Sequence, residues 1–188
     1  MNQLIKVMKR FLLLVLLSLL PVYVYAQQET INRNIAGLTL GRRYTVAQAE
    51  RAIEKKNHTF TKVYRESSSN TIMSLGSVQF AGEGWNHMIV VLESTGKVAN
   101  ICFERRFKDV NDADAFYVNM AKVVVLKYGA PNVDSRDLSV ESIWEDNRHT
   151  QLRLQVMPNT DASEIIVYLS YEDPRLMEKI QTDIIEEL

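Results

Sequence analysis

The feature of this chain that most constrains its fold is a series of short segments in which apolar and polar residues alternate. The links between the first four segments are only a few residues long and are rich in Ser, Asn and Gly. A period of two with β-branched and aromatic residues indicates strands. Parallel neighbours would need a crossover of a dozen residues or more, so these strands must pair antiparallel as a meander. They are expected at 60–66, 71–80, 86–93 and 97–106.

A helix is expected at the start of each half of the chain. Thr45 and Gln48 have the spacing of a capping box, in which each residue satisfies the other's backbone amide. A second helix is expected to begin at Asn111 or Asp112 and to end at Gly129, because glycine favours the left-handed conformation that follows a helix. Both helices have one apolar stripe, which must be buried against a sheet.

Three more strands and a terminal helix complete the expected fold. The strands are predicted at 138–145, 150–157 and 164–171, and the helix opens at Asp173-Pro174. Seven strands and three helices in this order indicate an α+β protein with antiparallel meanders and helices packed on one face. Residues 27–36 are expected to be a flexible tether. Residues 37–188 form either a single α+β domain or two lobes, at 37–107 and 108–188.

Two stretches suggest a resemblance to a known group of domains. The sequence Gly-Leu-Thr-Leu-Gly at 37–41 precedes the capped helix, and Leu-Lys-Tyr-Gly-Ala-Pro at 126–131 precedes a strand that carries Trp144. This pattern resembles the exported domains of the β-lactamase-inhibitor-protein type and the small lipoprotein domains of outer-membrane assembly. The resemblance implies helices on an antiparallel sheet, with two such units in tandem. It does not extend to inhibition or membrane assembly, because the only cysteine, Cys102, permits neither the inhibitor's disulfides nor the lipoprotein's anchor.

The first 26 residues predict export from the cytoplasm. Three basic residues precede an apolar run at 11–20, Pro21 follows, and Val-Tyr-Ala at 24–26 is a plausible cleavage sequence. The rival interpretation is a retained membrane anchor, which needs roughly 20 apolar residues. Because the run is about half that length, residues 1–26 are interpreted as a cleaved signal peptide. We expect a periplasmic or secreted protein with no membrane span after cleavage.

Charge and cysteine content narrow the class of partner. The chain has 22 basic and 23 acidic residues, and three of the basic ones precede the apolar run, so the mature protein is acidic overall. Nucleic acids and anionic membranes call for a basic excess, so neither is expected as a partner. The single cysteine excludes an intrachain disulfide, and the apolar core must therefore supply the stability.

No spacing typical of a catalytic or metal site was found. His58, His87 and His149 have no second His or Cys at the spacings that place two such ligands on one metal, and the cluster of Glu145, Asp146 and His149 is an incomplete ligand set in an expected turn. Cys102 lies within an apolar strand, where a thiol is typically buried and inert. The glycines at 82–84 lack the following helix of a phosphate-binding loop. We expect no cofactor, no metal and no catalytic motif.

Two hypotheses for function follow. The first is a non-catalytic exported module that binds a protein or a surface polymer through an open sheet face and adjacent loops. The alternative is a small extracytoplasmic hydrolase whose site residues are dispersed along the chain. The missing motifs favour binding. The candidate binding surface consists of Trp85, at the rim, with Tyr64, Gln79, His87, Arg153 and Gln155.

The leader generates the first testable prediction. Cleavage after Ala26 should give a mature chain that starts at Gln27, because the apolar run is too short to span a bilayer. Mass spectrometry of the periplasmic and secreted fractions of the producing cell checks this. Recovery of the intact chain from the membrane fraction would contradict it.

Overall fold

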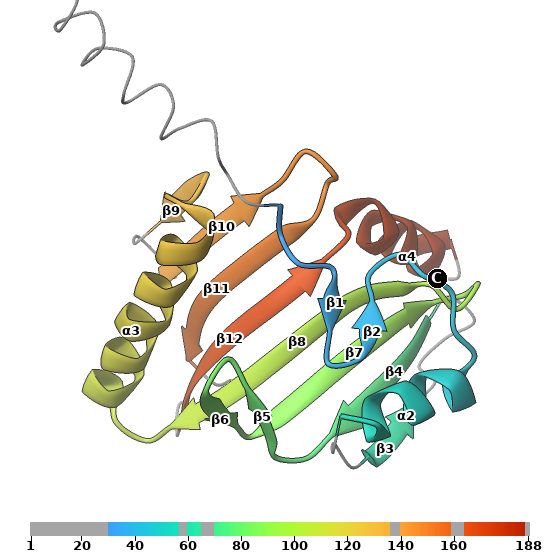
Figure 1. Ribbon diagram of the computed structural model, residues 1–188, viewed down its shortest axis with the longest axis horizontal. Helices are drawn as coiled ribbons and strands as arrows, with labels where there is room; N and C mark the ends of the chain where they lie inside the picture. The colour runs from blue at the N-terminus through green and yellow to red at the C-terminus, as the bar shows by residue number, and fades with distance from the viewer. Residues whose placement is uncertain (1–29, 57–59, 65–69, 136–139, 159–163, 187–188) are drawn as a thin grey trace, which may run out of the picture.

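The computed structural model describes residues 30–56, 60–64, 70–135, 140–158 and 164–186, and its main feature is one eight-stranded antiparallel sheet (Figure 1). The strand order is β3–β4–β7–β8–β12–β11–β10–β9. These strands are β3 (Phe60–Tyr64), β4 (Asn70–Leu75), β7 (His87–Glu93), β8 (Val98–Phe107), β9 (Val133–Ser135), β10 (Val140–Glu145), β11 (Gln151–Pro158) and β12 (Ile165–Glu172). The helices are α2 (Val46–Glu54), α3 (Val110–Tyr128) and α4 (Pro174–Glu186). Two small hairpins join β1 (Asn34–Ile35) to β2 (Leu38–Thr39) and β5 (Val78–Phe80) to β6 (Glu83–Trp85).

The sheet is shared equally by the two halves of the chain. Each half contributes four strands, and the halves meet where β8 pairs with β12, from Ile165 opposite Phe107 to Glu172 opposite Asn100. Within each half, strands that follow one another in the sheet are antiparallel. The predicted α+β class with an antiparallel sheet is confirmed.

The helix boundaries follow from local hydrogen bonds. The Thr45 hydroxyl accepts the Gln48 amide at 3.2 Å and the Gln48 side chain accepts the Thr45 amide at 3.0 Å, so the predicted capping box starts α2. Helix α3 is capped by Asp109 rather than by Asn111 or Asp112, because the Asp109 carboxylate accepts both of those backbone amides.

Gly129 ends α3, as predicted, with a φ of 82° and its amide bonded to the Val125 carbonyl at 2.9 Å. Helix α4 begins at Pro174, directly after Asp173, in agreement with the sequence. None of the helices in the described ranges is long and apolar enough to cross a membrane.

The single strand expected at 71–80 is wrong. It breaks after Leu75, and the chain then forms the β5–β6 hairpin, whose turn places Ala81 at φ 55° and Gly82 at φ 81°. The hairpin returns Trp85 into the core, where it is 2% exposed and its ring centroid lies 5.4 Å from that of Phe116. Trp85 is therefore a core residue and not the exposed rim residue that the sequence suggested.

Residues of the expected tether also lie within the fold. Ile31 and Ile35 are 3% and 2% exposed, and the Ile31 amide donates to Asp146 at 3.1 Å. Ile35 belongs to β1, which pairs with β2. The segment after residue 30 thus contributes apolar side chains to the core.

The two faces of the sheet are covered differently. Helix α3, helix α2 and both hairpins lie over one face, where Phe103, Leu154 and Leu169 are almost fully buried (Figure 1). On the other face the register aligns Cys102, Ser170 and Arg153 in one row across β8, β12 and β11. Helix α4 borders this second face and leaves much of it open.

A buried carboxylate on β7 forms an ion pair with a lysine of α4 and so connects this helix to the sheet. Glu93 is 3% exposed and accepts the Lys179 ammonium at 3.0 Å, the Ser94 hydroxyl at 3.1 Å and both the amide and hydroxyl of Thr95. Burial alone would raise the pKa of Glu93, but these hydrogen bonds outweigh it and lower the pKa to about 2.

The low pKa of Glu93 predicts a pH-dependent contribution to stability. Its folded pKa of about 2 lies below the ordinary 4.5, so ionised Glu93 stabilises the fold above pH 4.5, and this is lost as the pH falls towards 2. Glu93→Gln should lower the free energy of unfolding by about 2 kcal/mol at neutral pH, and the difference from wild type should shrink in acid.

Denaturant unfolding across this pH range measures the effect. Glu178→Gln, at an exposed α4 position with no ion pair among the described residues, is the matched control. A difference between wild type and Glu93→Gln that stays constant from neutral pH into acid would contradict the prediction.

Candidate functional site

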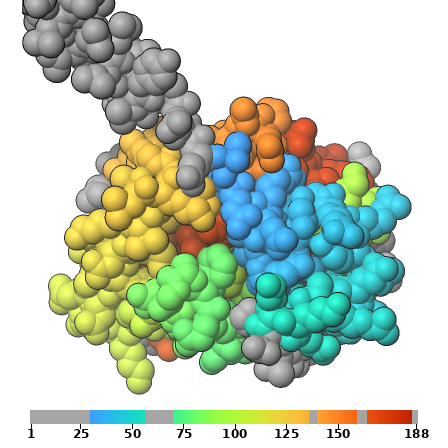
Figure 2. Space-filling model, in the orientation of Figure 1, coloured from blue at the N-terminus to red at the C-terminus, as the bar shows by residue number. Residues whose placement is uncertain are grey.

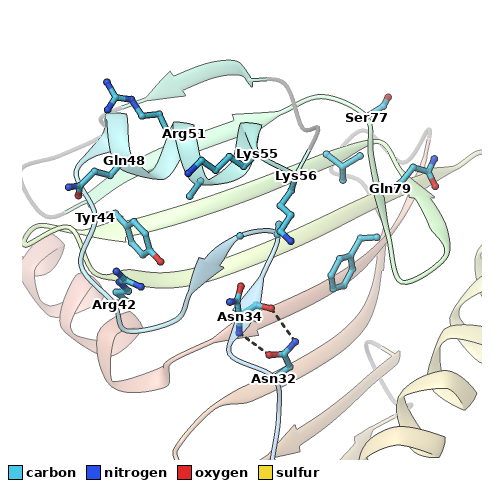
Figure 3. Close-up of a pocket in the computed structure, with 15 residues that line it drawn as sticks. Asn32, Asn34, Arg42, Tyr44, Gln48, Arg51, Lys55, Lys56, Ser77 and Gln79 are labelled. Carbon is cyan, nitrogen blue, oxygen red and sulfur yellow. Dashed lines mark hydrogen bonds between the residues drawn. The ribbon is translucent and has the colours of Figure 1, made fainter.

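A cleft of about 1270 Å³ lies beside α2. The β1–β2 hairpin, α2 and the β5–β6 hairpin adjoin on the face shown in Figure 2, and Figure 3 shows the side chains that line the cleft between them. The lining residues are Asn32, Asn34, Ala36, Gly37, Arg42, Tyr44, Gln48, Arg51, Ala52, Lys55, Lys56, Ser77, Val78, Gln79 and Phe80. They come from segments up to 48 positions apart in the sequence.

Positive charge dominates this cleft, hereafter the cationic cleft. Arg51, Lys55 and Lys56 extend from α2 and the residues after it, and Arg42 comes from the segment after β2 (Figure 3). No Asp or Glu is among the lining residues. Within the described part of the chain, none of the four cations forms an ion pair. The cleft therefore holds an uncompensated positive potential.

Several other arginines of the fold, unlike the cleft cations, have an acidic partner. Arg33 lies 3.1 Å from Asp173, and Arg105 lies 2.9 Å from Glu83. Arg106 contacts Glu104 at 2.6 Å, and this hydrogen bond raises the pKa of the guanidinium. These paired arginines contribute to the fold, whereas the charges of the cleft cations stay available to a ligand.

The remaining polar lining consists of amides and hydroxyls. The Asn32 side chain donates to the Asn34 carbonyl at 3.1 Å and accepts the Asn34 amide at 3.0 Å, which fixes its orientation (dashed lines in Figure 3). The side-chain amides of Asn34 and Gln79 have no hydrogen-bond partner among the residues described. These two amides can each donate to and accept from a ligand.

Close backbone contacts hold the walls of the cleft in place. Gly37 has a φ of 89°, and a Cβ at this position would lie 2.4 Å from the Ala52 carbonyl oxygen, so only glycine lets the hairpin turn approach α2 so closely. The Tyr44 amide donates to the Gly96 carbonyl at 2.8 Å, and the Val98 amide donates to the Arg42 carbonyl at 3.1 Å. Fixed walls reduce the entropy lost when a ligand binds.

The candidate residues from the sequence fall on different surfaces. Gln79 lies in the cationic cleft, on β5, and not on the main sheet. His87, Arg153 and Gln155 have the register of the open face, with His87 opposite Glu104 and Gln155 opposite Tyr168. The Tyr64 side chain lies outside the described residues, and Trp85 is buried as noted above.

The open face has a groove of about 470 Å³ between α4 and strands β8, β11 and β12. Arg153 lies in it but is paired with Glu141 at 2.9 Å and Glu172 at 3.2 Å. Cys102 also lines this groove and is partly buried. Burial raises the pKa of its thiol to about 12, with further contributions from Glu104 and Glu172. The thiol therefore stays protonated and is a poor nucleophile.

The cationic cleft was missed in the sequence because its residues are distant and its local signal is ambiguous. Lys55 and Lys56 follow a helix on which Glu50 and Glu54 also occur, a mixture typical of a solvated face. Arg42 joins them only because the chain turns back after β2. The one local signal that could have indicated a cationic site is the presence of two adjacent basic pairs, Arg42-Arg43 and Lys55-Lys56, on either side of the predicted helix.

Comparisons with known proteins found no matching family model, no matching curated protein and no matching solved structure. Among the described residues there is also no group of three His, Cys, Asp or Glu side chains placed to hold a metal ion.

The environment of Cys102 generates a prediction about thiol reactivity. Because its pKa is about 12, the native thiol should react with a disulfide reagent at pH 8 far more slowly than the unfolded chain does. Cys102→Ser should lower the free energy of unfolding by about 1 kcal/mol. Lys122→Cys in the Cys102→Ser background, on the exposed side of α3, is the reactive control. Equal labelling rates for native Cys102 and for the thiol introduced on α3 would contradict burial.

Proposed function

We propose that this protein is an exported, non-catalytic binding module that captures an anionic ligand in the cationic cleft. One observation carries the proposal: four cationic side chains line a preorganised cleft that has no acidic lining residue. The leader at 1–26 supports export to the periplasm or the cell exterior, where surface polymers and other exported proteins are the available partners.

Electrostatics favours an anion at this place. Two unit charges 4 Å apart attract by about 1 kcal/mol in water and by about 4 kcal/mol at the effective dielectric of a protein surface. Arg42 and Arg51 can each bind a carboxylate or a related oxyanion with two parallel hydrogen bonds. Because the cations are exposed, added salt should weaken this attraction.

The chemistry of the lining favours binding over catalysis. Its polar groups are ammonium, guanidinium, amide and hydroxyl groups, which hold charged and hydroxylated ligands. For the hydrolase alternative, the open-face groove offers Cys102, Tyr168 and Ser170 as candidate nucleophiles. Burial raises the pKa of Cys102 and of Tyr168, which keeps both protonated at neutral pH, and the Ser170 hydroxyl accepts the Asn100 side-chain amide at 2.9 Å, a group that cannot act as a base.

The open sheet face remains a second candidate binding surface. His87, Arg153 and Gln155 share this face, and the groove beneath α4 gives it a concave shape. The Arg153 guanidinium is already paired with Glu141 and Glu172. A partner on this face would therefore be held by shape and hydrogen bonds instead of by net charge. The two surfaces can therefore be separated by mutation.

Charge reversal in the cleft tests the proposed function. The probe is fluorescently labelled dextran sulfate, a generic polyanion, whose binding is followed by anisotropy at about 50 mM and 150 mM salt. Wild type should bind, and the affinity should fall with salt. Lys55→Glu/Lys56→Glu should weaken binding by at least about tenfold, because two attractive contacts become repulsive.

The matched control is Lys108→Glu/Lys122→Glu, which makes the same change in net charge at exposed positions outside the cleft. Circular dichroism confirms that each variant is folded. Equal losses in the two double variants would show that only net charge matters and would overturn the proposal. Loss of binding in Arg153→Ala, with Lys55→Glu/Lys56→Glu unaffected, would move the site to the open face.

A further inference from the structure

We infer that the ligand of the cationic cleft is an anionic polysaccharide, a sugar chain that carries carboxylate or sulfate groups along its length. The inference rests on the proposed function of the cleft and adds the class of ligand. It draws on the neutral polar side chains of the lining, on the size of the cleft and on the absence of a deep apolar pocket among the lining residues.

The neutral polar groups match sugar hydroxyls. Asn34 and Gln79 present side-chain amides with no partner among the described residues, and Ser77 adds a hydroxyl. An amide both donates and accepts hydrogen bonds, as does a pair of neighbouring sugar hydroxyls. A polyphosphate only accepts, so the exposed amide oxygens of Asn34 and Gln79 would stay hydrated and add nothing to its binding. Hydroxyl groups beside anionic groups satisfy both kinds of lining residue.

The size of the cleft favours an extended ligand. Its volume of about 1270 Å³ exceeds the usual range for small-molecule sites, which is about 300 to 1,000 Å³. Arg51 and Lys55 are one helical turn apart, about 6 Å along the axis, and Arg42 lies on a separate segment. A ligand that engages these cations together must carry several anionic groups along one chain.

The apolar lining offers no deep pocket to anchor an acidic peptide. It comprises Ala36, Ala52, Val78, Phe80 and the ring of Tyr44. Val78 is 3% exposed, and the Phe80 ring stacks on that of Phe103 with centroids 4.1 Å apart, so both pack in the core. The half-buried Tyr44 ring is held by the hydrogen bond of its hydroxyl with the Thr39 amide and has the Arg42 guanidinium 5.5 Å from its centroid. Peptide interfaces draw most of their affinity from large side chains set in apolar pockets, whereas a single flat aromatic ring flanked by a cation and amides can pack against the face of a sugar.

Isothermal titration calorimetry with defined probes tests the ligand class. The probes are oligogalacturonate, which carries carboxylates, and heparin oligosaccharide, which carries sulfates. Methyl-esterified oligogalacturonate is the neutral sugar, and poly-glutamate and polyphosphate are anions without sugar. At least one charged oligosaccharide should bind about tenfold more tightly than poly-glutamate and polyphosphate, and which of the two does so identifies the anionic group.

Amide removal separates sugar recognition from charge. Asn34→Ala/Gln79→Ala should weaken binding of the charged oligosaccharide by about tenfold and leave binding of poly-glutamate and polyphosphate unchanged. The control is Asn111→Ala/Asn119→Ala, which removes two exposed amides of α3 that line neither the cleft nor the open-face groove and should change neither.

The outcomes distinguish this inference from the proposed function beneath it. If poly-glutamate or polyphosphate binds as tightly as the oligosaccharides, and Lys55→Glu/Lys56→Glu still abolishes binding, the cleft is an anion site but the polysaccharide inference is overturned. If the neutral ester binds as tightly as oligogalacturonate, or if no anionic probe binds, both are overturned.

Discussion

The pairing of β8 with β12 is the constraint on which the rest of this structure depends. It joins two four-stranded meanders, one from each half of the chain, through a continuous ladder from Asn100 to Phe107. Helix α3 contacts β8, β11 and β12 and so packs across the seam. Buried side chains of both halves, such as Phe103 and Leu169, lie in one core cluster. Neither half could bury its apolar face in this way by itself.

The two halves that meet at the β8–β12 pairing are covered differently, and this difference determines where the cleft lies. The apolar face of the second half is covered by the long helix α3, whereas the first half covers its own strands with α2 and two small hairpins (Figure 1). A short helix and two hairpins cover a sheet less completely than one long helix does. The cationic cleft lies between α2 and the two hairpins. Gly37 permits the contact that fixes this boundary, so the cleft is a consequence of the packing.

Local signals in the sequence predicted the elements well, while features that depend on distant residues were missed. The Thr45 capping box, the Gly129 stop and the period-two strands each arise from interactions within a few residues. The β8–β12 pairing could not be predicted, because short links determine neighbours only within a meander. Trp85 was predicted at a rim because it borders the glycine loop at 82–84, and the β5–β6 hairpin, which buries it, was not predicted. The cationic cleft was also missed, since residues as distant in the sequence as Arg42 and Gln79 line one cleft only in the folded chain.

The net charge of the whole chain does not describe the local charge of the cleft. Net charge predicts long-range attraction, but here acidic and basic residues are distributed unevenly: Arg33, Arg105 and Arg153 are neutralised by partners, while the cleft cations are not. The potential inside the cleft is therefore set by its own lining residues, and an anionic ligand there is compatible with a chain whose net charge is only −1.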